Sequence, residues 1–464
     1  MTISDNMVFA QEIEIGLDEI LPVKFGVNKK NELVRLVYEI CRAGDLSINE
    51  VFTWIEIDRL IEGGKGELFH RVKDALVRIR YPSAGPDDDL HIMPVRMDAV
   101  AGECSTWDLT LKPEEIFIEK DVLDLEWTQA FLRGFPQVKT ALINDVKDVF
   151  KTFPGKDPLE LYNLRREKVF LTKNRSAFIK ICPCTKGYKR CGYWILNLGF
   201  GCPMDCVYCY LQTYSNAPGM ILPANIKDYY GYIRGFDRKA GKRTRIGTGE
   251  FTDSLAFDKY TGYSSYLIPF FRDMKNLVLE LKTKTGNIDN VLKEQPHENA
   301  VISWSVNTPV VAEKYEKGGI NVSDRIEAAV RAAERGFKIG FHFDPIVYYN
   351  GWKDEYKNVI EEMFTHREIR EKTVWISLGT LRYTPSLKQV AEQRFEENLM
   401  FYQGEFFMDT DGKLRYPRDL RVDMYNRMIG WIRSFVDTCW IYLCMEPEEL
   451  WKKTVLKRSD YSFR

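Results

Sequence analysis

The chain has 464 residues, with 66 Lys and Arg against 67 Asp and Glu, and a formal net charge of −1. Its 45% hydrophobic and 29% charged residues are typical of a globular protein of two or three domains and exclude a low-complexity or globally basic protein. No apolar run reaches the ~18 residues of a membrane span, and the N-terminus lacks the basic and apolar stretches of a signal peptide. We therefore expect a cytoplasmic protein with no membrane association.

The first part of the chain is predicted to be helical. Apolar residues recur at helical spacing through 27–82, and we expect residues 1–112 to form a mainly helical N-terminal extension. Residues 113–190 are predicted to form an α/β lead-in segment, with a strand at 116–120 and a helix at 128–135.

A regular alternation of β-rich and helical stretches follows. The expected strands are 193–199, 245–250, 277–283, 300–306, 338–345 and 373–379. A helix at 323–336 is expected to begin with a Ser323 cap and to end at Gly336. This alternation indicates βαβ units and a parallel sheet. We therefore predict an α/β fold in which residues 191–464 form an open or partial (β/α)6 barrel, with a late strand at 439–444.

The ten cysteines are distributed unevenly, because six of them lie between residues 182 and 209. Disulfide frameworks instead distribute cysteines through a short secreted chain, so this cluster indicates metal binding. An expected strand runs directly into Cys202, Cys206 and Cys209, spaced C-x3-C-x2-C. Three thiolates on one loop can hold three irons of a [4Fe–4S] cluster and leave the fourth iron open.

Zinc is the alternative occupant of this loop, with Cys184 or Cys191 as a fourth ligand. The position after a strand that opens a βα series, the aromatic Tyr208 and the absence of a nearby His favour the iron–sulfur cluster.

The motif C-x3-C-x-aromatic-C after the first strand of a βα barrel resembles that of radical S-adenosylmethionine (SAM) enzymes. The resemblance implies a [4Fe–4S] cluster held by Cys202, Cys206 and Cys209, with SAM chelating the open iron. It also implies reductive cleavage of SAM to a 5′-deoxyadenosyl radical that abstracts hydrogen from substrate, with flavodoxin or ferredoxin as electron donor. Tyr208 would lie near the adenine of SAM, and the fold would be the partial TIM-like barrel of this superfamily.

A closer resemblance is to spore photoproduct lyases, radical SAM lyases that repair a thymine dimer in spore DNA. The cluster loop CVYCYLQT (206–213) is similar to theirs, and the similarity spans roughly residues 115–445. The similar segments follow in order at 116–136, 281–292, 304–318, 331–352 and 381–395. This resemblance implies that Lys284, Ser305 and Asn307 contact the cofactor.

One departure from that family concerns the loop after the second barrel strand. There the spore enzymes carry a cysteine that donates a hydrogen atom to the product radical, whereas GTGEFTDSLAFD (247–258) has Glu250 or Phe251 in its place. Asp253 and Asp258 keep the surrounding pattern. Dimer repair by that route is therefore in doubt. Glu250 is a candidate catalytic residue or a contact for the amino group of SAM, with a solvated loop carboxylate as the alternative.

Two polar residues alternate within one expected strand and so share a face: His342 and Asp344. If that face lines the barrel, both are catalytic candidates for substrate contact or proton transfer, with a satisfied core residue as the alternative for His342. Arg382, after the sixth strand, could meet a phosphate or carboxylate, or form a surface ion pair.

Four further cysteines have several interpretations. Cys182, Cys184 and Cys191 precede the cluster loop and suit a second metal centre, a radical-quenching thiol, or packing as small hydrophobic residues. Cys444 ends the late strand, from which it could reach a barrel mouth.

Three functions are compatible with these patterns. The first is a radical SAM enzyme that acts on a nucleic-acid base in DNA lesion repair. The basic and aromatic stretch 231–245 lends this modest support, because its Lys and Arg could contact phosphates and its aromatic residues could stack on bases, although a solvated loop is the favoured interpretation of the stretch. The second is a diverged paralogue that modifies a small molecule or peptide, favoured by the missing donor cysteine and the neutral net charge. The third is a zinc-stabilised nucleic-acid-binding module without enzymatic activity.

Overall fold

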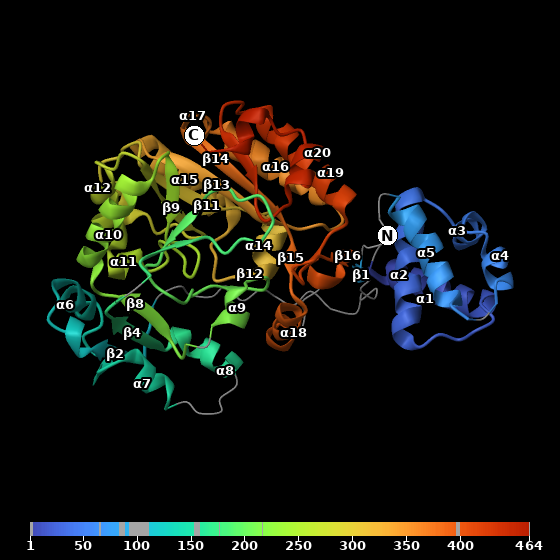
Figure 1. Ribbon diagram of the computed structural model, residues 1–464, viewed down its shortest axis with the longest axis horizontal. Helices are drawn as coiled ribbons and strands as arrows, with labels where there is room; N and C mark the ends of the chain where they lie inside the picture. The colour runs from blue at the N-terminus through green and yellow to red at the C-terminus, as the bar shows by residue number, and fades with distance from the viewer. Residues whose placement is uncertain are drawn as a thin grey trace.

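The computed structural model describes residues 3–64, 66–82, 89–91, 111–152, 158–175, 177–215, 217–395 and 400–463. A helical N-terminal part lies at one end of the long axis, and the rest of the described chain is built around a large curled sheet and three smaller sheets (Figure 1). Among these residues, no helix combines the length and the apolarity that crossing a bilayer requires.

The N-terminal part consists of helices with a hydrophobic core of their own. These are α1 (Ile3–Ile20), α2 (Val27–Gly44), α3 (Ile48–Trp54), α4 (Ile57–Glu62) and α5 (Leu68–Arg80). The helical stretch predicted at 27–82 is confirmed, and α1 adds a helix before it. Ser47 caps α3 by accepting a hydrogen bond from the Glu50 amide while the Glu50 carboxylate accepts one from the Ser47 amide. Leu33, Leu36 and Val37 of α2 form the centre of this core.

The lead-in segment forms a four-stranded parallel sheet in the order β3-β2-β4-β8. Its elements are β2 (Glu115–Glu119), η1 (Lys120–Val122), α6 (Glu126–Arg133), β3 (Lys139–Ile143), α7 (Val146–Phe150), α8 (Pro158–Asn163), η2 (Leu164–Arg166), β4 (Lys168–Thr172) and β8 (Met220–Pro223). The strand predicted at 116–120 and the helix predicted at 128–135 are confirmed as β2 and α6. Strand β8 comes from beyond the cluster loop, so this small sheet supports the loop from one side.

The large sheet has eight strands in the order β18-β14-β13-β11-β10-β9-β6-β5. They are β5 (Ile179–Ile181), β6 (Trp194–Leu196), β9 (Thr244–Gly247), β10 (Leu277–Thr283), β11 (Ala300–Ser305), β13 (Lys338–Ile346), β14 (Thr373–Thr380) and β18 (Trp440–Leu443). All neighbouring strands are parallel except β5 and β6, which form an antiparallel pair. The six predicted strands and the late strand are therefore confirmed, and the partial barrel gains a seventh parallel strand.

Helices between the strands cover the outer side of the curled sheet. They are α10 (Ile226–Lys239), α11 (Asp258–Thr261), α12 (Tyr263–Phe271), α13 (Asp289–Lys293), α14 (Pro309–Tyr315), α15 (Val322–Arg335), α16 (Trp352–Thr365) and α17 (Arg367–Lys372). Helix α15 ends at Gly336, as predicted, but Asn321 and not Ser323 caps it, because the Asn321 side chain accepts the Asp324 amide at 2.7 Å. The actual cap thus lies two residues earlier than predicted.

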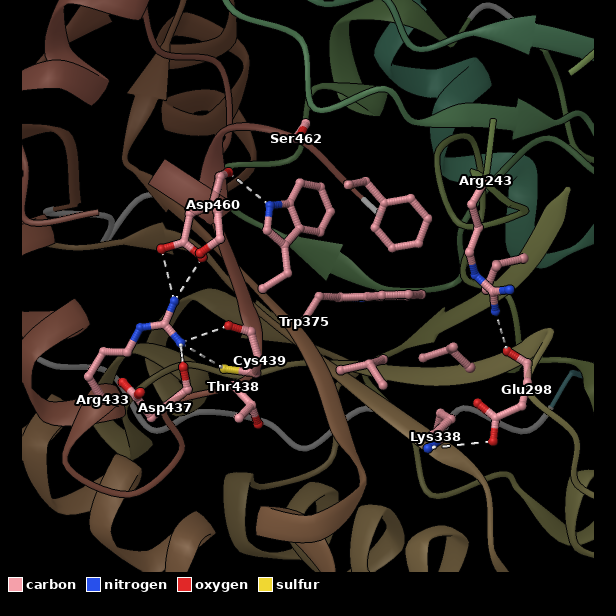
Figure 2. A pocket seen from close by; sticks show the side chains of 16 residues that line it. Arg243, Glu298, Lys338, Trp375, Arg433, Asp437, Thr438, Cys439, Asp460 and Ser462 are labelled. Atoms are coloured by element: carbon pink, nitrogen blue, oxygen red, sulfur yellow. Dashed lines mark hydrogen bonds and ion pairs between the residues drawn. The ribbon is translucent and has the colours of Figure 1, made fainter. Parts of the chain in front are cut away.

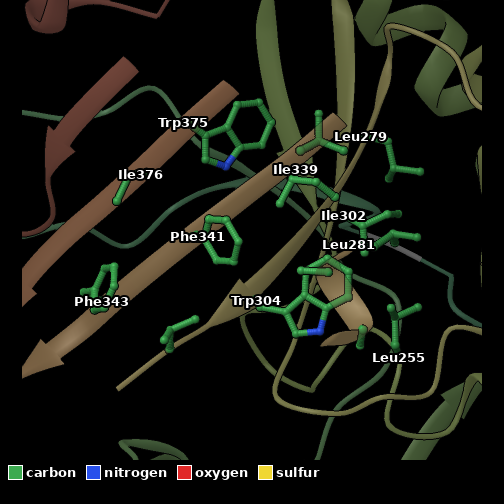
Figure 3. Packing of buried hydrophobic residues seen from close by; sticks show 14 of the residues in the cluster. Leu255, Leu279, Leu281, Ile302, Trp304, Ile339, Phe341, Phe343, Trp375 and Ile376 are labelled. Atoms are coloured by element: carbon green, nitrogen blue, oxygen red, sulfur yellow. The ribbon is translucent and has the colours of Figure 1, made fainter. Parts of the chain in front are cut away.

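The face of the sheet that the helices cover is apolar, whereas the inner face of the barrel carries polar side chains such as Glu280 and His342. Figure 3 shows Leu279, Ile302, Phe341 and Ile376 of four adjacent strands packed together, with Trp304 beside them. All five side chains are fully buried. This continuous core fixes the register of the strands and therefore the positions of the residues that follow their carboxyl ends.

The remaining elements lie in the cluster loop, in the connections between barrel strands and in the C-terminal part, apart from β1, which follows the N-terminal helices. They are β1 (Asp89–His91), β7 (Asp205–Cys206), α9 (Leu211–Tyr214), β12 (Glu316–Lys317), β15 (Arg382–Tyr383), α18 (Pro385–Arg394), η3 (Met400–Tyr402), β16 (Phe406–Met408), β17 (Leu414–Arg415), α19 (Arg418–Arg433), α20 (Glu448–Lys453) and η4 (Arg458–Tyr461). Strands β1, β16, β17 and β15 form a second four-stranded sheet. Arg35 of α2 donates to the Tyr402 carbonyl at 2.6 Å, and Arg80 of α5 pairs with Glu405 at 3.0 Å. The helical part is thereby attached through buried polar contacts.

Candidate active site

The cluster loop begins with a tight backbone turn directly after β6. Gly199 and Gly201 adopt φ of 107° and 101°, values that favour glycine. A Cβ atom at Gly201 would lie 3.4 Å from the Met220 Cα atom of β8. The Gly201 amide donates to the Phe251 carbonyl at 2.9 Å. The two glycines thus let the loop approach both β8 and the loop that follows β9.

The three cysteines of the motif lie together on this loop. Cys206 is buried, whereas Cys202 and Cys209 are half-buried, and all three pack with Met204 and Ala256. The Cys209 amide donates to the Cys206 carbonyl at 2.9 Å, which closes a turn between the second and third cysteine. The loop therefore presents three thiols from one short segment at the carboxyl end of β6.

A buried aspartate fixes this loop, and the sequence analysis missed it. Asp205 forms ion pairs with Arg165, with Arg166 at 2.8 Å and with Arg394 at 2.6 Å. Arg165 Nε also donates to the Cys202 carbonyl at 2.8 Å. Asp205 is 2% exposed, so its charge is offset by these three guanidinium groups and not by water. Its position within the cysteine motif was the only signal in the sequence, since two arginines come from η2 and one from α18.

Tyr208 and Lys284 meet at a second buried carboxylate, Glu316. The Tyr208 hydroxyl donates to Glu316, and the Lys284 ammonium lies 5.7 Å from the centre of the Tyr208 ring. Arg325 pairs with Glu316 at 2.5 Å. Burial opposes ionisation of Glu316, but Arg325 and Lys284 outweigh it and lower its pKa to about 2. Burial likewise opposes the charge on Lys284, but Glu316 and Cys206 outweigh it and raise the pKa of Lys284.

Strand β12 carries Glu316 to this position. It pairs with β7 in antiparallel register, with Glu316 opposite Cys206. The carboxylate is therefore held against the cluster loop by backbone hydrogen bonding. Glu316 lies within the segment 304–318 that resembles the spore enzymes, but nothing in its spacing indicated a role.

Ser305 and Asn307 occupy the carboxyl end of β11, as predicted. The Asn307 amide nitrogen donates to the Pro345 carbonyl at 3.0 Å, and its oxygen accepts from the Tyr356 hydroxyl at 2.5 Å. The Ser305 carbonyl accepts from Arg325 at 3.1 Å. Within the described part of the chain, no residue takes a hydrogen bond from the Ser305 hydroxyl or the Lys284 ammonium. Both groups therefore remain available to a ligand.

The loop after β9 carries Glu250 and Asp253, and these two carboxylates differ in their contacts. One Asp253 oxygen accepts the Leu255 and Ala256 amides at 2.9 and 2.8 Å, and the other accepts the Lys284 amide at 2.9 Å. Asp253 is thus a structural link between two strand ends. Glu250 is half-buried at the mouth and has no such hydrogen bonds within the described residues.

His342 lies deeper in the barrel than a catalytic residue at the mouth. Its Nε2 atom is 2.7 Å from Glu280, which also accepts from Ser303 at 2.7 Å and from Trp375 at 2.9 Å. Burial lowers the pKa of His342, and Glu280 only partly compensates. These contacts make His342 part of a buried polar network centred on Glu280.

Asp344 lies nearer the mouth, paired with Arg382. The Arg382 guanidinium donates to both Asp344 oxygens, at 2.9 and 3.2 Å. Burial opposes ionisation of Asp344, but Arg382 outweighs it and keeps its pKa below the usual value. The predicted strand places both His342 and Asp344, but they belong to separate networks.

The match to known proteins covers this whole arrangement. The model of the family described as "Spore photoproduct lyase" matches residues 111–412. The chain belongs to the spore photoproduct lyase family. Spore photoproduct lyase of Clostridium acetobutylicum is 24% identical over 275 residues, which cover 59% of this chain and 80% of that protein. The Bacillus subtilis enzyme is 23% identical over 341 residues, which cover 70% and 95%.

Solved structures agree in fold. A spore photoproduct lyase variant with bound AdoMet and dinucleoside spore photoproduct matches with a TM-score of 0.62 at 22% identity, covering 72% of this chain and 99% of that one. A complex with dinucleoside spore photoproduct matches with the same TM-score and coverage at 21% identity.

The family is one of radical SAM enzymes, which carry a [4Fe–4S] cluster and use SAM. The chain is therefore an enzyme with the partial barrel of this superfamily, as predicted. The third candidate function, a zinc-stabilised nucleic-acid-binding module without enzymatic activity, does not agree with this family membership.

The residues of this site suit a [4Fe–4S] cluster and SAM. Three thiols without disulfide bonds provide the soft ligands that an iron–sulfur cluster takes. The Lys284 ammonium and the Ser305 hydroxyl lie at neighbouring strand ends, where they can meet a carboxylate and a hydroxyl of a cofactor.

A well-formed pocket lies at the opposite end of the barrel. Figure 2 shows it lined by Arg243, Lys338, Trp375 and Asp460, which are close to the amino ends of the strands or in the C-terminal segment. The Arg433 guanidinium pairs with Asp460 at 2.8 Å on its rim. Because ligands of parallel α/β folds bind at the carboxyl ends of the strands, this pocket is not the site of the chemistry.

The basic and aromatic stretch 231–245 proved only partly available for nucleic acid. Arg245 is 2% exposed and lies within the barrel, 3.6 Å from Glu280 and against the Tyr442 ring. Arg245 is therefore not available to phosphates, because β9 directs its side chain into the core. Tyr232 on α10 is 56% exposed and stacks on Phe178.

Proposed function

We propose that this protein cleaves SAM reductively and abstracts hydrogen from a substrate bound over the barrel mouth. In this proposal Cys202, Cys206 and Cys209 hold the cluster. When bound, the [4Fe–4S] cluster and SAM supply the electron and the sulfonium whose cleavage gives the 5′-deoxyadenosyl radical. The observation that carries the proposal is the grouping of three thiols on one loop whose Tyr208 ring lies 5.7 Å from the Lys284 ammonium.

The surrounding residues have distinct binding roles in this proposal. Lys284, kept charged by Glu316, pairs with the carboxylate of SAM, and Ser305 and Asn307 bind its polar groups. Tyr208, held by its hydrogen bond to Glu316, flanks the adenine. Glu250 contacts the amino group of SAM or acts directly in catalysis.

We assign the substrate to the nucleic-acid bases, as a lesion in DNA. The support is family membership, together with the titles of related structures that contain dinucleoside spore photoproduct. Asp344 at the mouth is then a candidate to contact substrate or transfer a proton, with His342 behind it. A flavodoxin or ferredoxin supplies the electron, and the protein acts in the cytoplasm.

A specific observation favours a second candidate function. The loop after β9 carries Glu250 and Phe251, and the described part of that loop contains no thiol. A diverged family member that modifies a small molecule or a peptide would need no donor at this position.

The test of the first step is anaerobic reconstitution followed by reduction in the presence of SAM. We expect 5′-deoxyadenosine from the parent protein and from Cys439→Ala, which changes a buried cysteine at the amino end of β18. Cys206→Ala should reduce the product to background. Equal product from Cys206→Ala and the parent would refute the proposal.

The substrate class is tested separately by binding of DNA that contains a thymine dimer. Phosphate contacts are strongest when counterions are dilute, so we expect binding at ~50 mM salt that weakens as salt increases. Absence of binding at that salt, with normal 5′-deoxyadenosine formation, would refute a DNA substrate and favour a small molecule or a peptide.

A further inference from the structure

Four cysteines outside the cluster loop converge on the barrel mouth. Cys182, Cys184 and Cys191 lie in the segment that joins edge strand β5 to β6. Cys444 directly follows β18, the opposite edge of the same sheet. Curling of the sheet therefore gathers thiols that are far apart in the sequence and whose role family membership does not assign.

Hydrogen bonds and charge interactions place the four thiols in one neighbourhood. The Sγ atoms of Cys182 and Cys184 are 3.5 Å apart. The Lys189 amide of the first segment donates to the Glu446 carbonyl of the second at 3.2 Å, which joins the two sheet edges. A thiolate at Cys444 would repel one at Cys182, and thiolates at Cys184 and Cys191 would repel one at Cys444, so the four sulfurs lie within electrostatic range of one another.

The surroundings of these thiols are charged, which simple packing of small hydrophobic residues does not explain. Arg245 donates to the Cys191 sulfur at 3.5 Å, and Arg382 donates to the Cys444 sulfur at 3.7 Å. Arg382 also pairs with Asp344 at 2.9 Å. Guanidinium groups directed at sulfur are suited to offset the negative charge of a thiolate centre.

The spacing of the closest pair fits a shared metal ion. Metal–sulfur bonds of about 2.3 Å in a tetrahedral site place neighbouring sulfurs about 3.8 Å apart. The 3.5 Å between Cys182 and Cys184 is close to this value and far beyond a disulfide bond. No three His, Cys, Asp or Glu side chains of the described residues surround one ready-made metal position, and this also holds for the three cysteines of the cluster loop. The side chains of both sets of cysteines would therefore shift as they bind metal.

We propose that Cys182, Cys184, Cys191 and Cys444 form a four-thiolate metal centre at the barrel mouth. Its occupant is a thiophilic metal, as a zinc ion or an iron–sulfur cluster, because four-cysteine sets hold both. The Tyr210 hydroxyl of the cluster-loop segment donates to the Arg382 carbonyl at 3.2 Å, so this centre lies at the same end of the barrel as the cluster loop. It is a second site, beyond the function proposed above.

The test is metal and acid-labile sulfide analysis of the anaerobically purified full-length protein. In the Cys206→Ala background, which removes a ligand of the cluster loop, we expect retained metal: about one zinc, or iron with sulfide, per chain. Adding Cys184→Ser and Cys444→Ser should remove it, whereas adding Cys41→Ser in α2 should not. Equal metal content in the Cys206→Ala protein and in the variant that also carries Cys184→Ser and Cys444→Ser would overturn the proposal. Because the readout uses Cys206→Ala, it does not depend on SAM cleavage.

A second measurement needs no variant and so is independent of folding defects. Alkylation followed by peptide mass spectrometry of the parent protein should find Cys182 and Cys184 protected as purified and modified after treatment with a strong chelator under native conditions. Circular dichroism before and after chelation shows whether the fold persists. Modification of both residues to the same extent before and after chelation would also overturn the proposal.

Discussion

At the scale of single residues, the site and the barrel interior are held together by buried carboxylates that pair with guanidinium groups. Glu316, Glu280 and Asp205 are each at most 3% exposed, and each has at least one guanidinium partner within 4 Å. Burying a charged group costs desolvation free energy, and removing its partner strongly destabilises the folded protein. Their effects on stability and on ligand binding can therefore be measured by single substitutions.

Glu316→Gln removes the negative charge that faces Arg325 and Lys284. We expect a loss of about 3–5 kcal/mol in the free energy of unfolding, because Arg325 is left buried without a counter-charge. SAM affinity should also fall, since Tyr208 and Lys284 lose their common anchor. Denaturant unfolding and calorimetric titration with SAM measure the two effects. Glu327→Gln, at an exposed position of α15, should change neither; a similar loss there would argue against the specific role of Glu316.

The lowered pKa of His342 predicts a pH dependence of stability. In the folded protein the neutral imidazole is favoured, while in the unfolded chain the residue takes up a proton below its ordinary value of 6.5. Unfolding therefore becomes easier as the pH falls below 6.5, with a slope of up to about 1.4 kcal/mol per pH unit for one proton. Urea unfolding between pH 5 and 8 should show a weaker slope for His342→Gln than for the parent. Equal slopes for His342→Gln and the parent would contradict this prediction.

At the scale of elements, the cluster loop depends on neighbours that are far away in the sequence. Strand β7 within the loop pairs with β12, and η2 and α18 supply the arginines around Asp205. The three thiols thus keep their positions only while these elements remain docked.

Asp205→Ala should release this loop. Three guanidinium groups lose their shared partner, and we expect destabilisation of about 3–5 kcal/mol together with reduced iron incorporation. Denaturant unfolding and iron analysis after reconstitution measure both. Asp148→Ala breaks only the exposed pair with Lys151 and should change stability by less than about 1 kcal/mol. Unchanged iron content in Asp205→Ala would contradict the role of Asp205 in holding the cluster loop.

The close approach of β13 and β14 predicts a second effect at this scale. A Cβ atom at Gly340 would lie 2.3 Å from Trp375 Nε1 and 2.4 Å from Ser303 Oγ, two donors to Glu280. Gly340→Ala should therefore lower the melting temperature, with a cost of about 1–3 kcal/mol or more from overpacking. In α10, a Cβ atom at Gly235 meets only the end of Arg238 at 4.0 Å. Gly235→Ala should be neutral or stabilising by up to about 1 kcal/mol, and equal effects at both positions would contradict the packing argument.

At the scale of the whole molecule, the N-terminal helices and the barrel meet through a few buried contacts. Arg80 reaches Glu405, which is 3% exposed, and Tyr81 packs edge-on against Phe407 with ring centres 5.1 Å apart. The helical part thus contributes to the environment of the four-stranded sheet β1-β16-β17-β15.

Arg80→Ala should weaken this attachment. It leaves Glu405 buried beside Glu39, and we expect destabilisation of roughly 3 kcal/mol from breaking a buried pair. Denaturant unfolding measures this loss. Arg59→Ala, which removes an exposed pair with Glu56, should cost less than about 1 kcal/mol. Equal losses from the two substitutions would show that the interface does not depend on the buried pair.

The sequence alone determined the elements and the motif. Strand and helix periodicity predicted the barrel strands, because burial imposes a repeat that is local along the chain. The spacing of Cys202, Cys206 and Cys209 predicted the cluster loop for the same reason, since all three ligands lie on one short segment. Lys284 and Ser305 followed from resemblance and lie at the expected strand ends.

Only the tertiary structure decided which distant residues meet. Asp205 acquires its arginines, Glu316 its place opposite Cys206, and Arg245 its buried position from strand pairing and sheet curvature. Likewise, Cys444 approaches Cys182 because the two edges of one sheet curl towards each other. These contacts depend on long-range packing, which leaves no periodic trace in the sequence, and so no local pattern could have predicted them.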